Sequence, residues 1–200
     1  NIRFGKILSA MLYLLLPLAV VCALENYTHV ITDLAPLILV LNLLFFYVLY
    51  GLLTALTGSV RMGFRLASLV PMLFGLTNYF VVGFRGSPIV PWDLLSFGTA
   101  ASVADNYEFV LSWKAFYSVL AFIWIILLSS KSTVRLGRKK LRVISIAAYA
   151  ALMFLYVGEI QNSAVQSFFG MDTTLFTLNV LYRNNGIAAA FLGNLRFLNI

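Results

Sequence analysis

Long apolar runs, separated by short polar segments, make up most of the chain. A helix that crosses a hydrocarbon core about 30 Å thick takes about 20 residues, and somewhat fewer when its polar ends reach the headgroups. Five runs are candidates, although the last is short: residues 7–24, 34–59, 66–84, 109–130 and 143–158. The pattern predicts an all-α integral membrane protein with five transmembrane helices within residues 1–158.

The first run also has the features of a secretory signal peptide, because it follows the basic start NIRFGK and contains Cys22 as a candidate lipoprotein cysteine. Val21 precedes that cysteine, at a position where a signal peptidase site has a small residue. Four further apolar runs also follow the first. An uncleaved first helix is therefore the better interpretation. Cys22 is the single cysteine, so the chain has no disulfide framework, and we interpret this residue as lipid-facing or as part of the packing.

The charged residues alternate between two sets of segments along the chain. Ten of the fourteen basic residues lie before the first run, between the second and third, or between the fourth and fifth: Arg3, Lys6, Arg61, Arg65, Lys131, Arg135, Arg138, Lys139, Lys140 and Arg142. The acidic residues lie in the other segments: Glu25, Asp33, Asp93, Asp105, Glu108, Glu159 and Asp172. Short loops rich in Lys and Arg stay cytoplasmic. The N-terminus is therefore predicted inside and the C-terminus outside, and the basic segment 131–142 is interpreted as a topology determinant rather than a docking site.

Composition supports the membrane assignment and excludes several functions. Hydrophobic residues make up 62% of the 200 residues and charged residues only 10%, which is more apolar than a soluble domain requires. The net charge of +7 would suggest nucleic acid in a soluble chain, but here topology explains it, and no nucleic-acid partner is expected. His29 is the single histidine and has no neighbouring His or Cys at metal-ligand spacing. No catalytic or metal-binding residue is predicted in this chain.

The segment after the third run, residues 84–108, is neither a short loop nor a span. In RGSPIVPWD, Pro88 and Pro91 donate no backbone hydrogen bond and push the preceding residues toward extended conformations, so a rigid turn is expected. Asp93 or Ser96 is placed to cap a short helix over the residues that follow. The sequence predicts a loop and helix that lie on the outer leaflet or dip into it.

Arg85, Trp92 and Asp93 are the candidate site residues of this segment. Tryptophan is enriched at the level of the headgroups, and the planar guanidinium of Arg85 suits a phosphate diester. A lipid-headgroup role is one interpretation. The other is an ion pair between Arg85 and Asp93 that only fixes the turn, and the sequence leaves both open.

Residues 159–200 contain apolar runs that are too short to span. They are interrupted by Asp172, Arg183 and Arg196, so amphipathic helices at the outer interface are predicted. The sequence RNNG is the expected turn between them, with Gly186 in a left-handed conformation.

Two stretches, NYFVVGFRGSPIVPWDLLSFGTAASVADNYEF and NNGIAAAFLGNLRFLNI, resemble the membrane portion of the lipoteichoic acid synthase family, the sulfatase-like phosphoglycerol transferases of Gram-positive bacteria. The specific part is Arg-Gly-x-Pro followed by Pro-Trp-Asp-Leu, and the five-span layout covers the whole chain. The resemblance implies a bacterial cell-membrane location and phosphatidylglycerol as the lipid partner. It also implies an extracytoplasmic catalytic domain after residue 200, with a threonine nucleophile and a divalent metal, usually manganese. No position of this chain inherits those catalytic or metal roles.

The sequence therefore favours a membrane anchor that has residues 159–200 as a juxtamembrane extension toward this catalytic domain. Its function would be to anchor the transferase and to guide its lipid substrate, and a second copy of the chain is a further candidate partner. The alternative is a non-enzymatic polytopic membrane protein, such as a transporter subunit or an assembly scaffold. A transporter would carry polar or charged groups in mid-span, whereas the runs contain only scattered ones such as Asn42 and Thr54.

Overall fold

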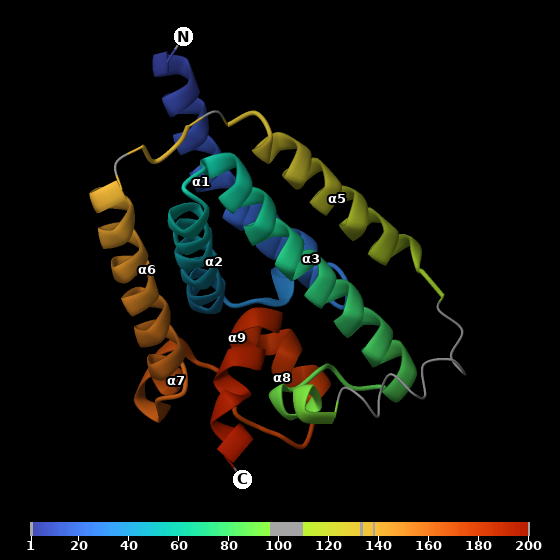
Figure 1. The fold of residues 1–200 in the computed structure, drawn as a ribbon. Coiled ribbons are helices and arrows are strands. Elements are labelled where there is room, and N and C mark those ends of the chain that lie inside the picture. Colours follow the sequence, from blue (N-terminus) through green and yellow to red (C-terminus); the bar gives the residue numbers. More distant parts are fainter. Residues whose placement is uncertain (1, 97–109, 133, 138, 200) are drawn as a thin grey trace.

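A computed structural model describes residues 2–96, 110–132, 134–137 and 139–199, and these residues are helical throughout apart from their connections (Figure 1). The long helices are α1 (Ile2–Glu25), α2 (Pro36–Thr57), α3 (Val60–Arg85), α5 (Trp113–Ser129) and α6 (Lys139–Glu159). The short ones are η1 (Ile31–Asp33), η2 (Pro91–Ser96), α7 (Ser163–Phe169), α8 (Leu178–Asn185), α9 (Ile187–Gly193) and η4 (Asn194–Asn199). No β-strand occurs among the described residues.

Four of the long helices, α1, α2, α3 and α6, are long and apolar enough to cross a membrane. The all-helical, multi-pass membrane architecture read from the apolar runs is confirmed to that extent. Helix α5, the expected fourth span, has 17 residues and is shorter than these four, so a fifth crossing stays a prediction. Helix α6 is longer than its apolar run because it begins at Lys139, and its basic first turn can reach the headgroups.

Helix α2 is central to the bundle (Figure 1). Helices α1 and α3 pack on one side of it and α6 on the other, while α5 packs against α1 and α3. The largest buried side chains between α1, α2, α3 and α5 are Tyr27, Tyr50, Phe46, Phe64 and Phe122. Helix α6 has no buried residue among those described, so most of its surface is left for lipid.

The two ends of the bundle differ in charge. One end, here called the basic end, holds the contacts of Arg61 and Arg65 with the backbone of Ser132 and the hydroxyl of Ser130. Arg142 donates from Nε to the Ala55 carbonyl at 2.8 Å and so caps the last turn of α2 at the same end. The other end, here called the acidic end, carries every acidic residue that the structure describes: Glu25, Asp33, Asp93, Glu159 and Asp172. The charge segregation read from the sequence is thus present in three dimensions.

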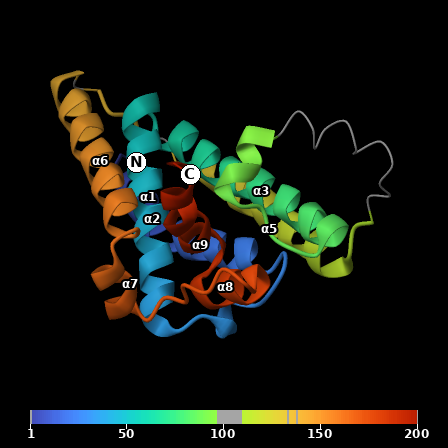
Figure 2. The ribbon, with the colours of Figure 1, turned by 90° about the horizontal axis from the view of Figure 1, so that it is seen from below.

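At the acidic end, α8 and α9 lie at the centre of the end-on view, with α6 and α7 on one side and α3 and α5 on the other (Figure 2). Helix α8 is amphipathic, with Leu181 and Tyr182 buried and Arg183 exposed, as expected for an interfacial helix. Helix α9 is different, because Ile187 through Ala190 are all buried. The prediction of amphipathic helices therefore holds for α8 and not for α9, which is inserted between the ends of α1 and α2.

Two buried polar side chains hold α9 in this position. The Asn42 amide donates to the Asn185 carbonyl at 2.8 Å, and its Oδ1 accepts from the Ala189 backbone N–H at 3.1 Å. Glu25, which is fully buried, accepts from the Ile187 N–H at 2.8 Å. The first turn of a helix has backbone N–H groups without acceptors inside the helix. The side chains of Asn42 and Glu25 supply acceptors for two of these groups in α9.

Gly186 makes the close approach of Asn42 to α9 feasible. Its φ of 76° confirms the expected positive φ, although its ψ of 153° lies outside the left-handed helical region. A Cβ atom at this position would come within 2.7 Å of the Asn42 side chain. Glycine is therefore required at position 186 both by the backbone and by the packing.

We expect Gly186→Ala to destabilise the protein more than Gly170→Ala. Both glycines have positive φ, but a Cβ at Gly170 meets nothing within 4 Å, and the ψ of 33° there is one that alanine can adopt at a cost of about 1 kcal/mol. At Gly186 the clash with Asn42 adds to a backbone strain of about 1–3 kcal/mol. Thermal unfolding in detergent measures the difference, and equal losses for the two variants would contradict the role of Asn42.

Orientation can be tested at positions that the structure shows to be exposed. In a Cys22→Ser background, a cysteine replacing Ser163, at the acidic end, should react with a membrane-impermeant thiol reagent on intact cells. One replacing Gly137, in the basic connection before α6, should react only after the cells are opened. Position 137 suits the test because a side chain there meets nothing within 4 Å. Labelling of position 137 on intact cells would reverse the predicted orientation.

Candidate functional site

Arg85 and Asp93 form an ion pair across the turn that follows α3. Arg85 Nη1 donates to Asp93 Oδ1 at 2.7 Å, and Nη2 donates to Oδ2 at 2.5 Å. The guanidinium also donates to the carbonyl oxygens of Ser87 and Pro88. Helix α3 ends here because Gly86 takes up the left-handed conformation, with φ 73°. Residues 85–93 are called the 85–93 turn below.

The ion pair uses most of the hydrogen-bonding capacity of Arg85. Four of its five N–H donors have acceptors within the turn, and one N–H on Nη1 is left. Both side chains are nevertheless partly accessible, with 32% of Arg85 and 27% of Asp93 exposed. Both Nη atoms of the guanidinium thus donate to Asp93. A phosphate could accept only the remaining N–H unless the ion pair between Arg85 and Asp93 broke.

The electrostatics of Asp93 reflect this arrangement. Burial by itself raises the pKa of this carboxyl group. The hydrogen bonds from Arg85 and from the Val90 N–H at 2.8 Å, together with the charge of Arg85, outweigh burial and hold the pKa below its usual value. Asp93 is therefore ionised at neutral pH and is a permanent partner for Arg85.

The 85–93 turn is packed against the C-terminal helices. The Tyr182 hydroxyl donates to the Ile89 carbonyl at 2.6 Å, and the Asn179 amide donates to the Gly86 carbonyl at 2.6 Å. Val90 is buried in a cluster with residues of α8 and α9, and the Trp92 ring lies 6.3 Å from that of Phe197, edge to face. Trp92 is therefore half-buried between the turn and η4.

The sequence prediction for this segment needs one correction. Asp93 does not stand before a helix as a cap, because it lies inside η2 and its carboxylate accepts from Val90 on the preceding side. The expected helix over the next residues falls mostly in 97–109, outside the described residues. The ion pair that the sequence left open is present, and the lipid-headgroup role of Arg85, Trp92 and Asp93 stays a prediction.

A second polar group at the acidic end was not predicted. Glu25 Oε2 faces His29 Nε2, and His29 Nδ1 lies 2.9 Å from the Thr28 hydroxyl oxygen. Glu25 is fully buried and His29 is 9% exposed, so the three side chains form a short relay from the core to the surface. The signal in the sequence was the spacing of four residues between Glu25 and His29, which one further turn of backbone after α1 brings together, with the His29 N–H donating to the Glu25 carbonyl at 2.9 Å.

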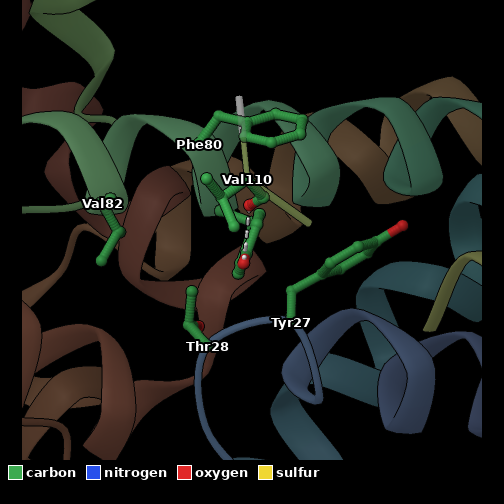
Figure 3. A pocket seen from close by; sticks show the side chains of 7 residues that line it. Tyr27, Thr28, Phe80, Val82 and Val110 are labelled. Atoms are coloured by element: carbon green, nitrogen blue, oxygen red, sulfur yellow. Dashed lines mark hydrogen bonds between the residues drawn. The ribbon is translucent and has the colours of Figure 1, made fainter. Parts of the chain in front are cut away.

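The Thr28 end of this relay opens into a cavity of about 360 Å³ (Figure 3). The walls come from the segment after α1, the last turns of α3 and one residue before α5: Tyr27, Thr28, Tyr79, Phe80, Val82, Gly83 and Val110. Tyr79 is fixed by hydrogen bonds, since its hydroxyl donates to the Val110 carbonyl at 3.2 Å and accepts from the Ser112 N–H at 2.9 Å. The Tyr27 ring forms one wall, with its hydroxyl directed away from the cavity (Figure 3).

Within the described residues no group of three or more His, Cys, Asp or Glu side chains is placed to hold a metal ion. Comparison with known proteins adds no assignment: no family model, no curated protein and no solved structure matches the chain. The arrangement itself therefore carries the functional argument.

We expect Asp93→Asn to lower the free energy of unfolding by about 1 kcal/mol at pH 7, because it removes a partly exposed ion pair and weakens the Val90 contact. An aspartate whose folded pKa is depressed stabilises the fold above its unfolded pKa of about 3.9, and this contribution is lost as the pH falls through the lower folded pKa. The deficit of the variant should therefore shrink as the pH falls below about 3.9. Glu159→Gln, at an exposed position of the same end, is the control; a deficit that is unchanged at low pH would contradict the assignment.

Proposed function

We propose that the chain is the membrane domain of a phosphoglycerol transferase similar to the lipoteichoic acid synthase family, acting in a bacterial cell membrane. One observation carries the proposal. The two stretches of sequence on which the resemblance rests are far apart in the chain, yet they pack together as one unit, since Val90 shares a buried cluster with Ala190 and the Trp92 ring lies edge to face with that of Phe197. A motif shared with a family is expected to be a folded unit of this kind if it has a common role.

The position of this unit suits a protein that works on lipid. It sits at the end of helices that are long enough to cross a membrane, and it presents a half-buried tryptophan beside a partly exposed ion pair. Tryptophan and arginine are both favoured at the depth of the headgroups. We assign to the unit the task of holding a fixed, charged surface against phosphatidylglycerol at the outer leaflet.

In this proposal catalysis belongs to an extracytoplasmic domain after residue 200, as the resemblance implies, and the divalent metal, manganese in the family, belongs there too. The helices described here tether that domain, and α8, α9 and η4 fix the direction in which the chain leaves the membrane. Tethering raises the concentration of an enzyme at the interface where its lipid substrate lies.

The proposal predicts that the 200-residue chain releases no diacylglycerol from phosphatidylglycerol, with or without manganese. The protein encoded by the complete gene should release it in the presence of manganese, and faster than its external domain alone on lipid in vesicles, because of the tether. Diacylglycerol is measured after extraction.

Turnover by the 200-residue chain would reveal an active site among residues 1–200. A complete protein without activity would favour the non-enzymatic polytopic alternative. Equal rates for the tethered and free external domain on vesicles would remove any role for the membrane helices beyond attachment.

A further inference from the structure

We propose that the cavity beside Thr28 binds the ester-linked glycerol region and one acyl chain of a membrane lipid, with the Thr28 hydroxyl as its polar contact. The site is separate from the 85–93 turn and does not depend on the proposed transferase function. The proposal rests on the position of the cavity, the chemistry of its walls and the relay behind Thr28.

The cavity lies at the depth of the lipid ester groups. Helix α3 ends at Arg85, and Tyr79 lies six residues earlier, which is about 9 Å along the helix axis. Thr28 follows the end of α1 by three residues. In a bilayer the headgroup layer on each side is about 5–8 Å thick, so a site reaching about 9 Å below the helix end meets the boundary between headgroups and hydrocarbon.

The walls are uncharged, which distinguishes the cavity from a headgroup site. Phe80, Val82 and the Tyr27 ring provide apolar surface, and none of the described residues that line the space is charged. Burial raises the pKa of Tyr27 to about 12, so this wall stays neutral at physiological pH. A cavity of about 360 Å³ with apolar walls and a few polar groups is of the size that takes a small part of a ligand, such as a chain and its ester.

Thr28 is the polar group with hydrogen-bonding capacity to spare. The Tyr79 hydroxyl already donates to the Val110 carbonyl and accepts from the Ser112 N–H, whereas among the described residues the Thr28 hydroxyl has one partner, His29. A hydroxyl group can donate once and accept twice. Where His29 Nδ1 donates to the Thr28 oxygen, the Thr28 hydrogen is left to point at an acceptor in the cavity. Ester carbonyl oxygens are acceptors of this kind.

The cavity and the 85–93 turn occupy adjoining faces of α3. Tyr79 and Gly83 are four residues apart and face the cavity, and Val82 lines its edge. Asn78 and Arg85 are seven residues apart and face the turn, where the Asn78 amide oxygen accepts from the Ile89 N–H at 2.8 Å. We therefore expect the charge of Arg85 to contribute little to the selection of a lipid in the cavity.

The test uses the purified chain in nanodiscs that contain lipids with a photoreactive diazirine in one acyl chain. Three probes differ only in the headgroup: phosphatidylglycerol, phosphatidylcholine and diacylglycerol. After illumination, labelled peptides that contain residues 27–28 or 79–83 are quantified by mass spectrometry. We expect all three probes to label these peptides to a similar extent, because the cavity contacts the part they share.

Two pairs of variants make the test specific. Gly83→Leu fills the cavity and should reduce the labelling of residues 27–28 by about fivefold or more, while Gly158→Leu, where a side chain meets nothing within 4 Å, should not. Thr28→Val removes one hydrogen bond and should weaken labelling by about two- to tenfold, whereas Thr28→Ser should restore it. Thermal unfolding of each variant is measured alongside, and Val82→Trp replaces Gly83→Leu if that variant fails to fold.

Labelling by phosphatidylglycerol alone would overturn the uncharged assignment and make the cavity part of a headgroup site. Labelling that is indifferent to both cavity-filling variants would show that lipid does not enter the cavity. If the complete protein shows no phosphoglycerol transfer while the cavity is labelled as expected, the proposed function is wrong and this inference still holds.

Discussion

The requirement that buried polar groups be hydrogen-bonded governs how the C-terminal part of this chain is placed. Asn42 and Glu25 are fully buried within helices that otherwise carry apolar side chains. An unpartnered amide or carboxylate in such surroundings costs several kcal/mol. Asn42 Oδ1 and Glu25 Oε1 accept from first-turn N–H groups of α9, which have no partner inside their own helix, while Glu25 Oε2 faces His29 Nε2. The buried side chains and the first turn of α9 therefore stabilise each other. As a result, α9 lies inside the bundle rather than on its surface.

Helix α8 connects α9 to the 85–93 turn, so the position of α9 determines where α8 contacts the turn. Gly186 joins α8 directly to the buried start of α9, so α8 has little freedom once α9 is docked. Asn179 and Tyr182 on α8 then bind the carbonyl oxygens of Gly86 and Ile89. The geometry of the Arg85–Asp93 pair thus depends on contacts that begin at Asn42, on the opposite side of α9.

The sequence was sufficient for what depends on local pattern. The apolar runs located all five long helices, and the prolines with Gly86 located the turn after α3. The contact of Arg85 with Asp93 was available as one of two interpretations because the residues are eight apart within a rigid turn. The hydrogen bond between Asn42 and Ala189 was not predictable, since the residues are 147 positions apart. In the sequence, Asn42 is an isolated polar residue within an apolar run. The contact between Glu25 and His29 was not predicted either, since it forms across the turn that follows the last residue of α1.

The two lipid contacts that we propose, at the 85–93 turn and in the cavity, have different physical consequences. An ion pair at the depth of the headgroups interacts with charge, and its strength falls with salt and with the protonation of Asp93. An uncharged cavity one or two turns deeper interacts with the part of the lipid that is common to all glycerolipids, and it is insensitive to both. A membrane domain that needed only to anchor a soluble enzyme would require neither feature. If both faces bind, α3 would hold a lipid by its chain on one side while a charged group is offered on the other, and the rigidity of the 85–93 turn would fix the distance between the two.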